Sequence, residues 1–173
     1  MAGETGGRVR GGPGNANGKG NGVHPFHLDD VSKAIIEQLQ RDGRLSYSSI
    51  GKAVGLSEAA VRQRVQKLID HGVMQIVAVT DPLQLGFARQ AMIGIRAEGD
   101  LEPIADELAE MPEVDYVTIT AGSFDLLVEV VCESDEHLLE LLSHRIRAIK
   151  GVRSTESFMY LRLHKQTYAW GVR

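Results

Sequence analysis

Cysteine and long apolar runs are both scarce in this sequence. Cys132 is the only cysteine, which excludes an intramolecular disulfide and is typical of a reducing compartment. No apolar run approaches the ~20 residues of a membrane-spanning helix, and the N-terminus has no apolar secretory signal. Apolar residues still make up 43% of the chain, which is enough to build a core. We therefore expect a cytoplasmic, nucleoid-associated protein without a membrane partner.

Arrangements that support catalysis or metal binding are also missing. Of the six histidines only His24 and His27 lie at i, i+3, and no cysteine cluster accompanies them. Residues 14–20 read GNANGKG, but Pro13 stands where a phosphate-binding loop needs its first glycine, and no predicted strand precedes them. No nucleophile–base pairing or dinucleotide fingerprint is present. We expect no enzyme activity, no metal and no resident cofactor.

The net charge of −4 is unevenly distributed. Residues 1–28 sum to +2, residues 29–73 to +1 and residues 74–173 to −7, so the excess acid lies in the C-terminal part. Residues 1–22 contain nine glycines and almost no apolar side chains. Such a composition does not bury enough surface to offset its ordering entropy, so we predict a disordered tail over residues 1–27.

Residues 45–68 predict two short helices joined by a tight turn. Gly55 permits the turn, and Ser57 is suited to cap the second helix. A preceding helix over residues 28–40, capped by Asp29 or Asp30, completes a three-helix domain. Both helices of the pair have apolar stripes at helical spacing: Ile50, Ala53 and Val54 in the first, and Val61, Val65 and Leu68 in the second.

The second helix is polar and basic on its other face, as a helix that enters a DNA major groove must be. We expect Gln63 to contact a base edge and Lys67 a phosphate; the alternative is a solvated helix face. Arg64 lies nearer the packed stripe, where an ion pair with Glu37 or another acid is the alternative. The candidate DNA-binding residues are Ser57, Ala59, Ala60, Arg62, Gln63, Arg64 and Lys67.

After the helices, residues 73–79 are apolar and β-branched and predict a strand, followed by a turn at Asp81-Pro82. From residue 88, alternating and helical patterns follow one another in the order β-α-β-β-α-β, with the last strand over residues 154–163. The predicted fold class is α+β, with an N-terminal winged helix-turn-helix domain and a C-terminal ferredoxin-like domain. The expected domains are residues 28–74, a linker strand and turn over 75–87, and residues 88–173.

A four-stranded sheet with both helices on one face leaves its other face bare. We expect that face to carry these side chains, or their neighbours if the register shifts by one: Tyr116, Leu127, Val131, Phe158 and Tyr160. A second copy of the same face is the simplest cover, so we predict a homodimer through this domain. Two reading helices then imply a two-fold or pseudo-palindromic site in double-stranded DNA.

The chain resembles the Lrp/AsnC family of regulators from about Leu28 to its C-terminus. The resemblance is carried by LDDVSKAIIEQLQRDGR, SIGKAVGLSEAAVRQRVQKL, the strand into DPLQLGF, and TAGSFDLLVEV. It implies a bacterial or archaeal transcriptional regulator that dimerises through the C-terminal domain and builds tetramers, octamers or larger assemblies. It also implies an amino-acid effector bound between C-terminal domains of neighbouring dimers.

The family's G-x-x-D pattern is matched by Gly122 and Asp125. A glycine leaves backbone N–H groups open to a carboxylate, and an aspartate suits an α-ammonium group. The alternative is that Gly122 only permits the hairpin turn and Asp125 only caps it. The candidate effector-binding residues are Thr118, Thr120, Gly122, Ser123, Phe124 and Asp125.

The sequence thus predicts a sequence-specific DNA-binding regulator that responds to an amino acid. One alternative is an effector-independent protein that organises the nucleoid. Another is an amino-acid-sensing regulatory subunit of a metabolic enzyme, which needs a catalytic partner.

Overall fold

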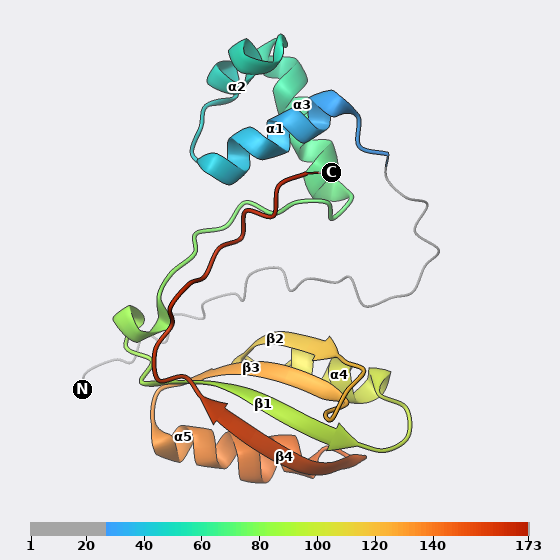
Figure 1. The fold of residues 1–173 in the computed structure, drawn as a ribbon, viewed down its shortest axis with the longest axis vertical. Coiled ribbons are helices and arrows are strands. Elements are labelled where there is room, and N and C mark those ends of the chain that lie inside the picture. Colours follow the sequence, from blue (N-terminus) through green and yellow to red (C-terminus); the bar gives the residue numbers. More distant parts are fainter. Residues whose placement is uncertain (1–26, 173) are drawn as a thin grey trace, which may run out of the picture. The chain divides into compact units, whose positions relative to one another are not determined.

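The computed structural model describes residues 27–172, and its contacts divide the chain into two units. The first comprises the residues up to Val77 together with those from Thr167 onward, and the second is Ala78–Gln166 (Figure 1). Each unit is described by itself. The predicted disordered tail lies outside the described residues, except for His27.

Three helices form the first unit: α1 (Asp30–Arg41), α2 (Tyr47–Val54) and α3 (Glu58–Asp70). Each begins after a residue whose side chain accepts a hydrogen bond from a backbone N–H group of the first turn, which satisfies a donor with no partner inside the helix. The three caps are Asp29, Ser46 and Ser57. The predicted helices and the two predicted cap positions are therefore confirmed.

The turn between α2 and α3 depends on two glycines. Gly55 ends α2 in the left-handed conformation, with φ of 73°, as predicted. Gly51 is buried, and a Cβ there would lie 2.5 Å from the backbone oxygen of Leu56. The expected apolar stripe of α2 is wrong in one member, because Ala53 is exposed. The core contains these buried residues: Ile35, Leu39, Ile50, Val61 and Val65.

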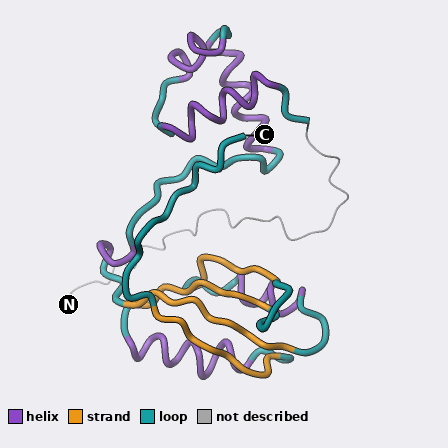
Figure 2. Tube along the Cα trace, viewed as in Figure 1, coloured by secondary structure: helices purple, strands orange, loops and turns teal. Residues whose placement is uncertain are grey.

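The predicted strand over residues 73–79 is not formed. Residues 74–81 have no regular structure, and a short 3-10 helix, Pro82–Leu85, follows (Figure 2). Ile76, Val77 and Val79 are exposed. A strand needs a hydrogen-bonding neighbour, and residues 74–81 form no β-ladder with any described segment. The described part of the helical unit accordingly contains helices and no wing strand.

The second unit is a four-stranded antiparallel sheet, in the order β2-β3-β1-β4. Its strands are β1 (Arg89–Ala97), β2 (Val114–Ile119), β3 (Leu126–Cys132) and β4 (Val152–Met159). The βαββαβ order confirms the predicted ferredoxin-like fold. The last strand ends at Met159, four residues before the predicted end.

One face of the sheet packs against α4 (Glu102–Ala109) and α5 (Asp135–Glu140), which lie between the strands in the chain order. α5 continues as a π-helix, Leu141–Arg145, and a 3-10 turn, Ile146–Ala148. The π-helix spaces the fully buried Leu141 and Ile146 five residues apart. An α-helical spacing from Leu138 would place Leu142 in the core instead, and Leu142 is only partly buried.

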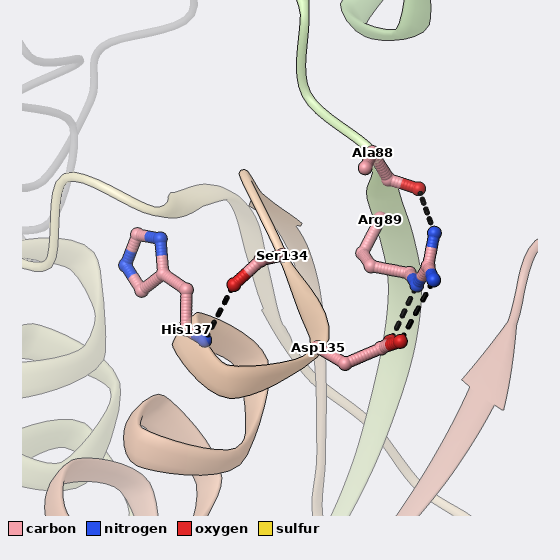
Figure 3. A network of polar contacts seen from close by, with 5 residues as sticks. All are labelled: Ala88, Arg89, Ser134, Asp135 and His137. Atoms are coloured by element: carbon pink, nitrogen blue, oxygen red, sulfur yellow. Dashed lines mark hydrogen bonds and ion pairs between the residues drawn. The ribbon is translucent and has the colours of Figure 1, made fainter.

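Two polar contacts hold the α5 segment to the strands. The Arg89 guanidinium donates to both carboxylate oxygens of Asp135, with Nη2 to Oδ2 at 2.8 Å (Figure 3). Glu113 Oε1 accepts from Arg145 at 2.6 Å and lies 3.1 Å from His137 Nε2. Burial raises the pKa of Glu113, but hydrogen bonds from His137, from backbone and from Arg145 outweigh it, so the net pKa is lowered.

The other face of the sheet, which we call the bare face, carries apolar side chains together with Gln90, Glu129 and Glu156. Glu129 of β3 pairs with Tyr116 of β2 and with Met92 of β1, and Met92 also pairs with Phe158 of β4. These four residues therefore lie on the same face of the sheet. Tyr116 is 52% exposed and Phe158 is 43% exposed in the single chain. Tyr116, Leu127, Val131 and Phe158 lie on this face as predicted, Met92 joins them without having been predicted, and the predicted Tyr160 lies just beyond the end of β4.

Candidate DNA-binding interface

The outer face of α3 is exposed along its whole length. Val61, Val65 and Leu68 are buried on its inner side, so the helical repeat turns the intervening residues outward. Ala59, Arg62, Gln63, Gln66 and Lys67 are exposed, whereas Ala60 and Arg64 are half-buried. Ser57 Oγ accepts from the Ala60 N–H group at 3.2 Å, so this hydroxyl caps the helix.

The exposed residues of α3 surround a shallow hollow, lined by Ala59, Arg62, Gln63, Gln66, Lys67 and Asp70. Gln63 forms no hydrogen bond to any described residue, whereas the Gln66 amide donates to Asp70 at 2.8 Å. An amide near the middle of a helix face is suited to bidentate pairing with an adenine edge. A neighbouring ammonium group at Lys67 is suited to a phosphate.

Arg62 has two partners that the sequence reasoning missed. Its guanidinium donates to Glu58 at 2.9 Å and lies 5.1 Å from the ring centroid of Tyr47. The ion pair could have been found, since residues four apart face each other on a helix. The ring contact could not, because it joins α2 to α3 across the turn. Both partners hold the guanidinium at the edge of the outer face, where an exposed pair contributes little stability.

Arg64 joins α3 to the start of α1. Its Nη1 atom donates to Asp29 Oδ2 at 2.7 Å and to Ser32 Oγ at 3.1 Å. The second oxygen of Asp29 accepts from the Ser32 N–H group at 2.8 Å. These bonds, first to Ser32 and then to Arg64, hold the pKa of Asp29 well below its ordinary value. An acid does pair with Arg64, as the alternative reading expected, but the acid is Asp29 and not Glu37.

The candidate effector residues lie together in the hairpin between β2 and β3, and several are engaged within the chain. Asp125 Oδ2 accepts from the Ala97 N–H group at 2.8 Å, where β1 has an irregular register. Thr120 Oγ1 donates to the Phe124 carbonyl at 2.6 Å, and Thr118 makes only a long 3.4 Å contact to the Ile119 carbonyl. Asp125 therefore has one oxygen in a structural bond and one that is not.

Phe124 covers a gap in the bare face. A Cβ at Gly94 would lie 2.7 Å from the Phe124 ring, so only glycine leaves room for this ring against β1. Arg96 lies over the same ring, 4.6 Å from its centroid, and donates to the Ser123 carbonyl at 2.9 Å. A Cβ at Gly122 would meet nothing within 4 Å, and its φ is not positive, so steric need does not explain this glycine.

No group of three or more histidine, cysteine, aspartate or glutamate side chains among residues 27–172 is arranged to hold a metal ion. No helix in the same range is long and apolar enough to cross a membrane.

Comparison with known proteins places both units in one family. An AsnC-type helix-turn-helix domain model matches residues 28–69. An AsnC-type model described as a C-terminal dimeric alpha+beta barrel domain matches residues 87–173. The two matches follow one another in the order of the units in the chain.

Relatives and solved structures agree with these matches. An uncharacterised HTH-type transcriptional regulator of Pyrococcus abyssi is 35% identical, over 82% of this chain and 91% of its own. The HTH-type transcriptional regulator FL11 of Pyrococcus furiosus is 34% identical, over 81% and 93%. The structure of Escherichia coli AsnC has a TM-score of 0.70 at 25% identity, over 83% and 98%.

A fourth neighbour shares the fold alone: the L-Met complex of a Neisseria meningitidis transcriptional regulator, with a TM-score of 0.71 at 23% identity, over 85% and 97%. The relatives and neighbours that carry a functional name are transcriptional regulators and not enzymes. The chain belongs to the Lrp/AsnC family of helix-turn-helix transcriptional regulators.

Proposed function

We propose that this regulator reads a specific duplex sequence with the outer face of α3. The observation that carries the proposal is the exposed Gln63, set between small and basic side chains on a helix whose other face is fully buried. Gln63 reads a base edge, Lys67 and Arg62 contact phosphates, and Ala59 lets the helix approach closely. Arg64 has a positioning role, because its hydrogen bond to Asp29 fixes α3 against α1.

The DNA site is two-fold, because we propose that two chains dimerise through the bare face of the sheet. The apolar side chains of that face would then be removed from water, as the dimeric description of the matching domain model supports. Larger assemblies, tetramers or octamers, are part of the same proposal. An isologous pairing presents two copies of α3 to one duplex.

Base reading is tested with Gln63→Ala and Lys67→Ala, measured by fluorescence anisotropy on a selected site and on random duplex. We expect Gln63→Ala to lower discrimination between the two duplexes by about 1–3 kcal/mol, the usual worth of a bidentate base contact. Lys67→Ala should weaken binding to the selected site and to random duplex about equally. Gln84→Ala and Lys150→Ala, away from α3, are matched controls. Unchanged binding by both test variants would remove the assigned contacts.

We further propose that an amino acid binds at the hairpin between β2 and β3 and modulates DNA binding. The neighbour solved with L-Met has the same fold, and the free oxygen of Asp125 suits an α-ammonium group. No other cofactor is proposed. A protein that organises DNA without an effector is the second candidate, because Asp125 also has a structural bond in this chain.

Calorimetry with the twenty amino acids separates the two candidates. A ligand that binds wild type should lose at least tenfold in affinity to Asp125→Asn, because the amide oxygen can still accept from the Ala97 N–H group while the charge is lost. Asp115→Asn, on β2, is the matched control. No heat with any of the twenty would support the effector-independent protein.

A further inference from the structure

The residues after the last strand differ in charge from the sheet unit that precedes them. Sixteen acidic residues lie between Asp81 and Glu156, and none follows Glu156. The stretch after it contains three cations, Arg162, Lys165 and Arg173. A cationic end on an acidic unit is a pattern that favours a polyanionic partner.

The same stretch leaves the sheet and is exposed. The Tyr160 N–H group donates to the Gln90 carbonyl at 2.9 Å, which is the last backbone bond to the sheet. Residues 161–172, here called the C-terminal tail, form no helix or strand (Figure 2). Leu161 is 96% exposed and Trp170 is 84% exposed. The Leu161 and Trp170 side chains are therefore open to a partner.

The tail cations differ from three arginines of the sheet unit. Arg89, Arg145 and Arg153 each form an ion pair with a carboxylate of the unit. Arg162 and Lys165 form no ion pair or hydrogen bond with any described residue. Although the sheet unit has many acids, no described acid pairs with Arg162 or Lys165, so both charges can bind an anion from outside the chain.

The division between the two units falls within the tail. Thr167 and the residues after it group with the helical unit that contains α3. Lys165 precedes Thr167 by two residues, so their Cα atoms are at most about 7 Å apart. A duplex held by α3 carries a phosphate charge about every 1.7 Å along its axis.

We infer that the C-terminal tail is a second DNA contact, in which Arg162 and Lys165 bind backbone phosphates of the duplex that α3 reads. The inference rests on the proposed DNA-binding function. Phosphate contacts strengthen binding and hold the duplex in register without reading its sequence. The tail thus supplies affinity, and α3 supplies specificity.

The test is the salt dependence of DNA affinity for the full chain carrying Arg162→Gln and Lys165→Gln. Each lost phosphate contact lowers the slope of log affinity against log salt by about 0.9, so we expect a fall of about two for each protomer whose tail is bound. The control is Arg147→Gln with Lys150→Gln, which removes the same charge before β4 begins. Discrimination between specific and random duplex should stay unchanged in the tail variant.

Each outcome decides the matter. A lower slope in the tail variant than in the control supports the inference. An equal slope in both overturns it, and an equal slope with an altered assembly size assigns the tail to the neighbouring subunit instead. Wild-type protein that binds no duplex at low salt overturns the proposed function itself. Iodide quenching of Trp170, the only tryptophan, should fall on adding DNA if the tail is bound, and should stay constant if it is not.

Discussion

At the scale of single residues, Asp29 makes two separate contacts, one with each carboxylate oxygen. One oxygen caps α1 and the other accepts from Arg64 of α3. Capping was predictable from the sequence, because aspartate before an apolar helical stripe is a common start signal. The link to Arg64, 35 residues away in the chain, was not, since nothing in a linear pattern identifies which acid faces a given guanidinium.

This double role has a pH dependence whose sign follows from the lowered pKa of Asp29. The ionised form is favoured by folding, so its stabilisation is present above the unfolded value of about 3.9 and is lost as pH falls toward the lower folded value. Asp29→Asn removes this ionisation but keeps an oxygen for the cap. We expect the excess melting temperature of wild type over Asp29→Asn to shrink between about pH 5 and pH 2.

Asp30→Asn is the control for that experiment, because Asp30 is fully exposed and its ion pair with Lys33 is long, at 4.0 Å. Melting is followed by the helical circular dichroism signal. A constant difference between wild type and Asp29→Asn across this pH range would show that the Arg64 contact does not depend on the charge of Asp29.

At the scale of elements, the helix-turn-helix depends on the close approach of α2 to the turn. Gly51 has no room for a Cβ against the Leu56 backbone oxygen, whereas Gly55 needs only its positive φ. The sequence alone indicated Gly55, because glycine between two helical patterns is a turn signal. It did not indicate Gly51, because a glycine inside a helical pattern gives no sign of what lies against it.

Gly51→Ala should therefore destabilise the helical unit although alanine favours helices. A backbone atom does not move aside as a flexible side chain does, so we expect a loss of about 1–3 kcal/mol in the free energy of unfolding, typical of overpacking. Chemical denaturation followed by circular dichroism measures it. Gly43→Ala is the matched control, with its nearest atom at an ordinary 3.8 Å. Equal stability of the two variants would contradict the close approach.

At the scale of the whole molecule, the bare face is the side of the sheet that a single chain leaves uncovered. It carries apolar side chains such as Tyr116 and Phe158, but the helices cover only the opposite side of the sheet. Residues 73–79 also lack a pairing partner. Their β-branched pattern predicted a strand, but they form no β-ladder within the single chain. Both observations favour a second copy of the chain.

Tyr116→Glu tests the dimer proposed for this face. A carboxylate placed in an apolar interface loses hydration without a partner, so we expect a dissociation constant at least tenfold higher by analytical ultracentrifugation. Leu139→Glu is the control, because Leu139 is also exposed, at 64%, but lies on α5. Unchanged dimerisation of Tyr116→Glu, or equal weakening by the control, would place the interface elsewhere.

The order of elements, the helix caps and the two faces of α3 and of the sheet were predictable from the sequence alone, because they follow from local hydrogen bonding and from periods of 3.6 and 2 residues. Tertiary structure decided which charges pair, where glycine is required by contact, the π-helix after α5 and the absence of a strand over residues 73–79. Those features depend on groups distant in the chain, and no local pattern records which groups meet.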